Sequence, residues 1–317
     1  MKVVIIGGCG HIGSYLVPKL VKAGNEVINI SRGKSKPYKE DYAWNEVKNV
    51  VLDRKNDETF AQKIASMDAD IVIDLINFTL EDTKNMVEAL QATRLTHYLF
   101  CSSIWAHGRA RSLPVTEDCV KEPLDEYGLE KLKCEQYLQE QYRLKGFPAT
   151  TIMPGQISGP GWNIISPLGN VNPDTFQRIA NGEEIFLPNF GMETLHHVHA
   201  DDVAQVFMNA ITHRNQAIGE SFHAVADESM TLFGFATAMY RFFGQEPNIK
   251  FLPWEKWCEH VKKEEDISSS YYHLARSGHF SMEKAKRLID FRPRHTTLET
   301  VEESVKSYLE RNIIKID

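Results

Sequence analysis

Tyr127 and Lys131 are the two residues of this sequence whose types and spacing most directly imply chemistry. They lie four positions apart in a helical pattern, so both side chains point from one face of the helix. A phenol with a pKa of about 10 is a poor acid or base at neutral pH. A neighbouring ammonium group favours the phenolate and lowers that pKa. The pair therefore predicts an acid–base centre in which Lys131 also binds cofactor ribose hydroxyls, and two ordinary surface residues are the alternative.

A glycine-rich turn near the amino terminus predicts where such a cofactor binds. The run G-G-C-G-H-I-G at positions 7–13 follows a short apolar segment and precedes a helical one. Residues without a β-carbon let backbone N–H groups approach a pyrophosphate, and the helix N-terminus adds the positive end of its dipole. The strand–turn–helix context separates this motif from a chance glycine pattern. The residues predicted to contact a dinucleotide here are Gly7, Gly10, His11, Ile12 and Gly13.

Strand and helix patterns alternate along the first half of the chain. Strands are expected at residues 3–6, 27–30, 47–52, 71–76, 98–102 and 149–153, and helices at 12–23, 59–67, 81–93 and 127–145. Short apolar strands that alternate with helices indicate a parallel sheet covered on both faces. The predicted fold class is α/β, a Rossmann-type doubly wound parallel sheet with a smaller C-terminal substrate-binding region. Ligands bind beyond the carboxyl ends of the strands in such sheets.

The composition changes after Met153, which predicts a boundary in the chain. Residues 155–173 are rich in Gly, Pro and Asn and are expected to form a loop. A return strand is expected at 196–199, followed by a helix that Asp202 caps. From about residue 227 the pattern is mainly helical, ending in an amphipathic segment at 298–311. We assign residues 1–153, with about 195–225, to the dinucleotide-binding domain, and residues 154–194 and 226–317 to the substrate-binding region.

The loop after the second expected strand carries Ser31 and Arg32. Dinucleotide-binding folds commonly hold an acid there, which accepts hydrogen bonds from the ribose hydroxyls. A hydroxyl and a guanidinium group suit a 2′-phosphate instead. We therefore predict a preference for NADP(H) over NAD(H), with a merely solvated cationic loop as the alternative.

Composition and charge exclude several classes of protein. The chain has 317 residues, of which 42% are hydrophobic and 25% charged, which is typical of a globular protein. Its net charge of −7 at pH 7 makes nucleic acid or an anionic membrane an unlikely partner. The five scattered cysteines and the absence of a signal peptide favour a cytoplasmic protein. His196, His197 and His199 lack a further ligand set in the sequence, so no metal is predicted.

Taken together, these motifs resemble those of the extended short-chain dehydrogenases/reductases of the NAD-dependent epimerase/dehydratase family. The resemblance covers nearly the whole chain. Besides the glycine turn, Tyr127 and Lys131, it includes Ser102-Ser103 with Gly108 five positions after Ser103, the segments 154–160 and 199–204, and Phe291-Arg292-Pro293. Residues 31–34 and 53–54 are most similar to the branch that contains chloroplast stem-loop-binding proteins.

The resemblance implies roles for individual residues. Ser103 would be the catalytic serine that holds the substrate oxygen, Tyr127 the acid–base and Lys131 its activator. Asp53 would contact the adenine, with Arg54 and Pro154 also at the cofactor. Trp105 and Gln156 would lie at the substrate, and a homodimer is expected. Ile104-Trp105 stand where the 4,6-dehydratases of the family carry Asp-Glu, so sugar dehydration is not expected.

The leading hypothesis is an NAD(P)-dependent oxidoreductase or epimerase that acts on a hydroxyl/ketone pair of a sugar or sugar nucleotide. Hydride would pass between the substrate carbon and the nicotinamide, with Tyr127 moving the hydroxyl proton. One alternative is a reductase of a small, non-nucleotide carbonyl compound. The other is a non-catalytic dinucleotide sensor or RNA-associated protein, against which the trio Ser103, Tyr127 and Lys131 argues, because a pure binder does not need it.

Overall fold

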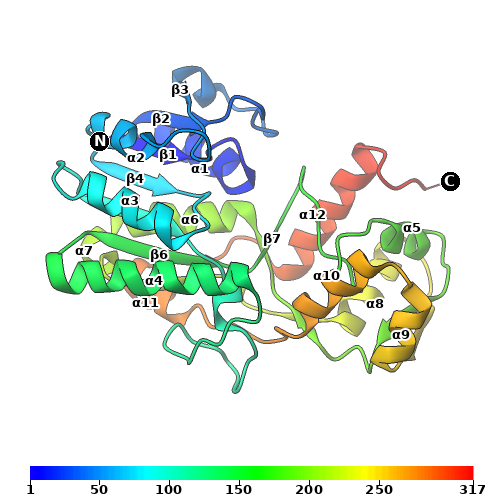
Figure 1. The fold of residues 1–317 in the computed structure, drawn as a ribbon. Coiled ribbons are helices and arrows are strands. Elements are labelled where there is room, and N and C mark those ends of the chain that lie inside the picture. The colour runs from blue at the N-terminus through cyan, green and yellow to red at the C-terminus, as the bar shows by residue number, and fades with distance from the viewer. Residues whose placement is uncertain (317) are drawn as a thin grey trace.

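A seven-stranded parallel sheet forms the centre of the larger lobe of the protein (Figure 1). The computed structural model describes residues 1–316. The strand order is β11-β6-β5-β4-β1-β2-β3, and each neighbouring pair is parallel. The strands are β1 (Lys2–Ile6), β2 (Glu26–Ser31), β3 (Lys48–Val51), β4 (Ile71–Asp74), β5 (His97–Cys101), β6 (Ala149–Pro154) and β11 (Ser221–Ala224). The order reverses between β1 and β4, where a crevice for a ligand opens in such sheets.

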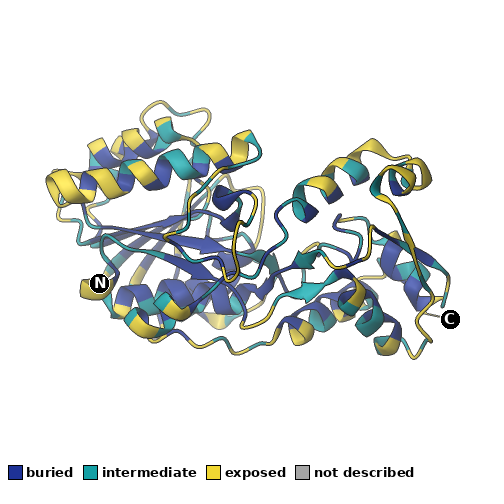
Figure 2. Cartoon of the chain, turned by 90° about the horizontal axis from the view of Figure 1, so that it is seen from below, coloured by how far each residue is buried: buried dark blue, intermediate teal, exposed yellow. Residues whose placement is uncertain are grey.

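Helices cover both faces of this sheet, in agreement with the predicted fold class. One face carries α1 (His11–Lys22), α6 (Ala200–Thr212) and α11 (Glu283–Ile289), and the other carries α2 (Phe60–Ser66), α3 (Leu80–Leu90) and α4 (Glu126–Lys145). The two-residue period of a strand sends Val3 and Ile5 into the first apolar cluster and Val4 and Ile6 into the second. Figure 2 shows the strands buried between helices whose outer faces are exposed.

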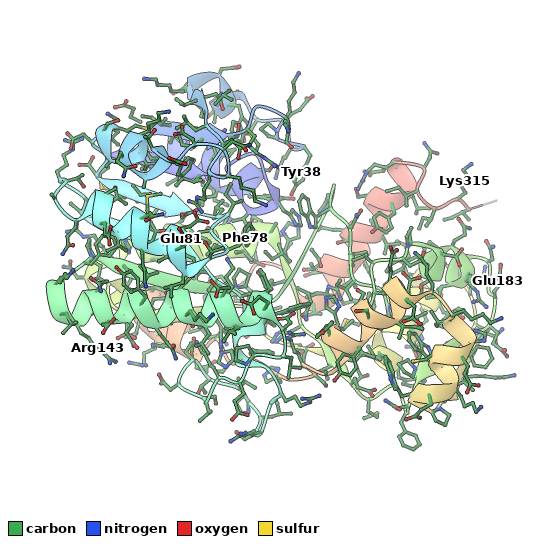
Figure 3. The ribbon with its side chains drawn as sticks, in the orientation of Figure 1. Tyr38, Phe78, Glu81, Arg143, Glu183 and Lys315 are labelled. Atoms are coloured by element: carbon green, nitrogen blue, oxygen red, sulfur yellow. The ribbon has the colours of Figure 1, made fainter. Side chains whose placement is uncertain are left out.

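The smaller lobe is built mainly from the chain after residue 154 and has its own apolar cluster. Its helices are α5 (Asp174–Ala180), α8 (Leu232–Phe242), α9 (Trp254–Val261), α10 (Glu264–Leu274) and α12 (Thr297–Glu310), while the short α7 (Arg214–Ala217) stays with the larger lobe. In Figure 3, Tyr38 and Phe78 lie on the larger lobe, and Glu183 and Lys315 lie on the smaller one. Among residues 1–316, every helix is too short or too polar to span a bilayer.

Short strand pairs in the second half of the chain were not predicted. Strand β11 adds to the main sheet beside β6. The expected loop at 155–173 contains β7 (Gln156–Ser158), which pairs with the expected return strand, β10 (His197–His199). Two further pairs are β9 (Thr194–Leu195) with β12 (Met230–Thr231) and β8 (Ile185–Pro188) with β13 (Ile249–Leu252). Strands of two to four residues carry too little periodicity to stand out in a sequence. The assignment of residues to two domains remains a prediction.

Asp202 does not cap α6, contrary to the expectation from the sequence. The cap is His199, whose Nδ1 accepts a hydrogen bond from Asp201 N. Asp202 is fully buried and turns to the segment before α12, where it accepts hydrogen bonds from Arg294 N at 2.8 Å and His295 N at 3.1 Å. The ring nitrogen Nδ1 of His295 lies 3.1 Å from the same carboxylate. Asp202 therefore fastens α6 of the larger lobe to the last helix of the smaller one.

We predict that Asp202→Ala lowers the free energy of unfolding by about 3 kcal/mol, because it leaves buried donors without an acceptor. Urea unfolding followed by circular dichroism measures the change. Glu88→Ala is the matched control, since Glu88 is exposed on α3 and its removal should change the free energy by less than about 0.5 kcal/mol. Equal unfolding midpoints for the two variants would contradict the role assigned to Asp202.

Candidate active site

Tyr127 and Lys131 lie in the first turns of α4, at the carboxyl edge of the sheet. Lys131 is only 1% exposed, and its Nζ donates hydrogen bonds to Asn77 O and Cys101 O, each at 2.6 Å. These carbonyl groups belong to the segment after β4 and to the last residue of β5. The lysine therefore ties the start of α4 to the ends of two adjacent strands.

Of the two serines after β5, the structure brings Ser103 to the tyrosine. The Ser102 hydroxyl donates to Glu135 on the buried side of α4. Ser103 begins the short helix η2 (Ile104–His107), and its Oγ accepts a hydrogen bond from Trp105 N at 3.2 Å. Ser103 is also close enough to Tyr127 to influence the pKa of its phenol. A substrate oxygen between Ser103 and Tyr127 would meet two hydroxyl groups.

The pKa of Tyr127 does not shift in the expected direction. Burial of the hydroxyl raises the pKa to about 12, Cys101 adds to the rise, and the hydrogen bond with Ser103 opposes it. The expectation that Lys131 lowers this pKa is wrong for the structure without ligands. Its ammonium group is held by two carbonyls, and burial lowers the pKa of Lys131 itself. Tyr127 as a whole is still 39% exposed, so its ring remains open to an approaching molecule.

Aromatic rings surround this pair. The ring of Trp105 lies edge-on to Tyr127 with centroids 5.8 Å apart. Phe78, which the sequence analysis did not identify, lies 6.3 Å from the Tyr127 ring, and Lys131 Nζ is 4.8 Å from its centroid. Phe78 is 48% exposed and lies four residues after the end of β4. An aromatic residue at that position was the available signal, because the carboxyl ends of strands border the ligand crevice.

The glycine turn has the shape that a pyrophosphate requires. Gly7 has φ +89°, and a β-carbon on Gly13 would lie 2.2 Å from Gly8 O. Helix α1 begins with Gly10 as its cap, and no side chain within the described residues accepts a hydrogen bond from its first turn. Free N–H groups and the helix dipole at this end suit an anion. These residues therefore fit the phosphates of a dinucleotide.

Asn29 holds the turn from the neighbouring strand, and the sequence analysis missed it. It is fully buried in β2, and its Oδ1 accepts a hydrogen bond from Gly8 N at 3.0 Å. Its Nδ2 donates to Asn49 Oδ1 at 2.8 Å and to Cys9 Sγ at 3.2 Å. A single amide in the otherwise apolar run V-I-N-I was the signal, because a buried amide needs partners.

His11 and Ile12 direct their side chains into packing contacts. The His11 ring stacks on Trp162 with centroids 4.8 Å apart, and burial lowers the pKa of His11 to about 3. Ile12 belongs to the core cluster on its face of the sheet. The predicted contacts of these two residues with a cofactor would therefore use backbone N–H groups.

Ser31 and Arg32 lie at the end of β2, next to Asp53. The Ser31 hydroxyl accepts a hydrogen bond from Gly33 N at 3.2 Å, and the Arg32 side chain is exposed. The pKa of Asp53 is lowered, chiefly by a hydrogen bond from Asn56, with a smaller contribution from the nearby charge of Arg32. The predicted phosphate-binding residues are thus close to the predicted adenine-binding residue.

The guanidinium group of Arg54 is occupied inside the protein. It pairs with buried Asp74 at 2.5 Å and donates to Ile76 O at 3.2 Å, while its flat face lies over the Phe60 ring. The structure therefore gives no support to the predicted side-chain contact between Arg54 and a cofactor. Its cation instead neutralises a carboxylate that would otherwise be buried alone at the end of β4.

Pro154 and Gln156 lie where β6 passes into β7. Pro154 is buried at the end of β6, in register with Ala224. The Gln156 side chain accepts a hydrogen bond from His196 N through Oε1 at 2.8 Å. Its Nε2 donors are left for a ligand, so Gln156 retains the capacity predicted for it.

Arg276 is a further residue of the site that the sequence did not reveal. Its side chain is 1% exposed, and its guanidinium carbon lies 3.9 Å from the centroid of the Trp105 ring. Nη2 is 3.0 Å from Asp125 Oδ1, the carboxylate that caps α4 two residues before Tyr127. Nη1 donates to Tyr272 O. Nε has no hydrogen-bond acceptor within residues 1–316, while the charge of the guanidinium group is paired with Asp125.

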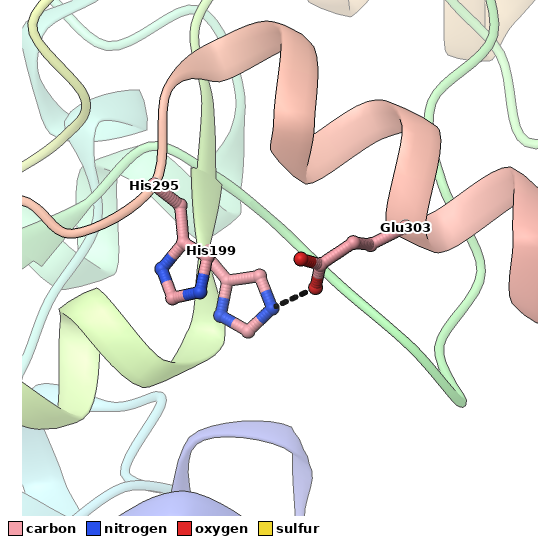
Figure 4. A group of neighbouring side chains, drawn as sticks. All are labelled: His199, His295 and Glu303. Carbon is pink, nitrogen blue, oxygen red and sulfur yellow. Dashed lines mark ion pairs between the residues drawn. The ribbon is translucent and has the colours of Figure 1, made fainter.

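His199, His295 and Glu303 form a cluster whose ligand atoms lie within 4.8 Å of one another (Figure 4). The two imidazole rings are stacked, with centroids 3.9 Å apart and 14° between their planes. A metal must lie in the plane of each imidazole that binds it, so two parallel rings do not converge on one ion. Because His199 Nδ1 accepts a hydrogen bond, Nε2 carries the proton and faces Glu303 Oε2 at 3.3 Å. Burial lowers the pKa of His199 to about 4, so the contact joins a neutral imidazole to the Glu303 carboxylate.

The fold is a Rossmann-type parallel sheet with a glycine turn that suits a dinucleotide, and Tyr127 and Lys131 lie at its carboxyl edge. A model of the NAD dependent epimerase/dehydratase family matches residues 3–224. The chain therefore belongs to the NAD-dependent epimerase/dehydratase family and is an enzyme of the extended short-chain dehydrogenase/reductase type. The resemblance stated from the sequence is confirmed.

Individual relatives agree with this assignment. The chain is 29% identical to the chloroplast stem-loop binding protein of 41 kDa b from Arabidopsis thaliana, over 96% of this chain and 78% of that protein. It is 24% identical to 2′-dehydrokanamycin reductase from Streptomyces kanamyceticus, over 85% and 74%. The structure of UDP-glucuronic acid 4-epimerase from Bacillus cereus, in complex with UDP-glucuronic acid and NAD, superposes with a TM-score of 0.75 at 17% identity, covering 98% of this chain and 100% of that one.

We predict that Gly13→Ala abolishes dinucleotide binding, because its β-carbon would lie 2.2 Å from Gly8 O and force the turn open. Calorimetric titration with NADPH and NADH measures the loss, which we expect to exceed about tenfold in Kd. Gly278→Ala is the control, since its β-carbon would meet only ordinary contacts from 3.4 Å outward. A Gly13→Ala protein that binds like the control would exclude this turn as the phosphate site.

Proposed function

We propose that this protein uses NADP(H), or NAD(H) with lower affinity, to interconvert a hydroxyl and a ketone on a sugar that carries an anionic group. The observation that carries the proposal is the placement of Ser103, Tyr127 and the buried Lys131 at one edge of the sheet, with Lys131 Nζ 5.7 Å from the centre of the Tyr127 ring. Membership of the epimerase/dehydratase family and similarity to sugar epimerases and a reductase support it.

The residues of the site divide the work by position. Ser103 holds the substrate oxygen, and Tyr127 takes the proton from the hydroxyl or returns it to the ketone oxygen. A bound nicotinamide dinucleotide supplies the hydride acceptor or donor and, when oxidised, a positive ring that favours the phenolate. Lys131 fixes the distance of α4 from the sheet edge and keeps its positive charge 5.7 Å from the centre of the Tyr127 ring. Phe78 and Trp105 limit the access of water to the phenol.

The anionic group of the substrate would bind at Arg276. This cation is buried against Trp105, pairs with Asp125 at the cap of the helix that carries Tyr127, and retains an unpaired donor on Nε. Gln156 offers its Nε2 donors on the far side of the site. A sugar nucleotide has a diphosphate that meets these demands, and so does a sugar phosphate or a uronic acid.

The fate of the hydride separates the two forms of the proposed reaction. In an epimerase the hydride returns to the opposite face of the same carbon, and the cofactor is unchanged. In a reductase the cofactor leaves oxidised. Incubation with UDP-sugars, sugar phosphates and keto-sugars, following epimer formation by NMR and cofactor oxidation by absorbance, distinguishes these outcomes. The proposal also includes a homodimer in the cytoplasm, which size-exclusion chromatography and fractionation would check.

Tyr127→Phe should reduce turnover by at least about 100-fold, because the variant has no group to move the proton. The comparison uses whichever substrate the screen identifies, and NADPH binding is measured in parallel to show that the site is intact. Tyr137→Phe, a change on the same helix outside the site, should retain full activity. Undiminished turnover in Tyr127→Phe would exclude the tyrosine as the acid–base.

Arg32→Ala should weaken NADPH binding by about tenfold and leave NADH binding unchanged, since the guanidinium would lose its contact with the 2′-phosphate. Lys36→Ala removes an exposed charge from the same loop and serves as the control. Equal losses in both variants would show a diffuse cationic loop without a phosphate site. Wild-type protein that binds NADH as tightly as NADPH would refute the proposed preference.

A further inference from the structure

A buried ion pair between Lys121 and Glu135 contacts Ser102, the residue before the proposed catalytic Ser103. Lys121 Nζ donates to Glu135 Oε2 at 2.5 Å, and the Lys121 and Glu135 side chains are 12% and 5% exposed. The second carboxylate oxygen of Glu135 accepts the hydrogen bond from Ser102. Lys121 Nζ also lies 3.4 Å from Met153 Sδ on β6. None of these side chains faces the cofactor turn or the Tyr127 phenol, so the reaction as proposed does not use them directly.

The pair acts on the same short segment as Lys131. Glu135 follows Lys131 by four positions on α4, so the two side chains lie on one face of the helix. Lys131 holds the carbonyl of Cys101, and Glu135 holds the hydroxyl of Ser102. Two consecutive residues at the end of β5 are thus fixed by two consecutive turns of one helix. The next residue in the chain is Ser103, whose position depends on both contacts.

Lys121 adds a third point of support from another segment. The chain around it crosses the end of η2, where Glu122 N donates to His107 O at 2.9 Å. A β-carbon on Gly108 would lie 1.8 Å from Glu122 O, so the two segments cross in direct contact. A carboxylate as deeply buried as Glu135 is costly without a cation, and Lys121 is the cation that neutralises it.

We propose that Lys121 and Glu135 are positioning residues of the active site, in which a buried ion pair fixes Ser103 through Ser102 and balances the charge beside Lys131. The inference rests on the proposed function only for its consequence on turnover. Its electrostatic part can be measured on the protein alone. Removal of Lys121 leaves a bare carboxylate next to Lys131, and removal of Glu135 leaves a bare ammonium group.

Titratable groups on three elements, β4, β5 and α4, lie around Lys131. They are Asp74 on β4, Cys101 on β5, and Tyr127, Cys134 and Glu135 on α4. Burial is the largest influence and lowers the pKa of Lys131, while the negative groups among these neighbours oppose it. A change in the charge balance at Glu135 therefore has a defined sign at Lys131. More negative charge raises the pKa of the lysine, and more positive charge lowers it further.

The test is an NMR titration of full-length protein labelled with ¹³C at lysine Cε, in which Lys131→Arg identifies the resonance. We expect Lys121→Met to raise the pKa of Lys131 and Glu135→Gln to lower it, each by about half a pH unit or more. Ser102→Ala keeps both charges and should leave the titration unchanged. The exchanged pair Lys121→Glu/Glu135→Lys should return the titration toward wild type.

Opposite shifts with rescue by the exchanged pair support the proposal, because structural damage has no reason to change sign between two variants. Shifts in the same direction, or none in either variant, overturn it. If a single variant fails to fold, the exchanged pair still decides, since a merely structural pair would not restore the Lys131 titration. Turnover is measured second. A protein that turns over no sugar but shows the opposite shifts refutes the proposed function and leaves the charge balance standing.

Discussion

The buried ammonium group of Lys131 is the constraint around which the site is arranged. A cation that is 1% exposed must have partners, because an unpaired buried charge costs several kcal/mol. Its partners are two backbone carbonyls, one after β4 and one at the end of β5. The carbonyl of Cys101 belongs to the sheet, and that of Asn77 belongs to the short segment that follows β4. The start of α4 is therefore held at a fixed distance from the sheet edge, which places the Tyr127 phenol beside Ser103.

The second half of the chain completes the site through contacts between the lobes. Arg276 reaches from the segment after α10 to the Trp105 ring and to Asp125, the cap of the catalytic helix. Asp202 fastens α6 to the segment before α12 by three contacts with one carboxylate. A ligand that binds Arg276 thus touches the smaller lobe and the catalytic helix at once. Arg276 and Tyr127 are therefore connected through Asp125, although they come from distant parts of the chain.

The sequence predicted the features that arise from local patterns. The alternating strands and helices, the glycine turn and the four-residue spacing of Tyr127 and Lys131 are all visible within short windows. It did not predict Arg276 or the partner of Asp202, because each depends on residues far away in the chain. Asn29 was overlooked although its signal is local, a single amide in an apolar strand. Its hydrogen-bond partners lie on the glycine turn and on the neighbouring strand. The sequence predicted a lowered pKa for Tyr127, and the structure has a raised one. The spacing of the two residues shows that an ammonium group is near, but it does not show which other groups that ammonium contacts.

The raised pKa of Tyr127 bears on how such a site operates. Burial raises the pKa of the Tyr127 phenol to about 12, which favours the protonated form at neutral pH. Lys131 cannot change this alone, since its charge is shared between two carbonyls and its own pKa is lowered. The remaining route to the phenolate is positive charge that arrives with a ligand, together with a hydrogen bond from Ser103. In the proposed reaction the positive ring of an oxidised nicotinamide would favour the phenolate, so Tyr127 would accept a proton more readily when the cofactor is bound.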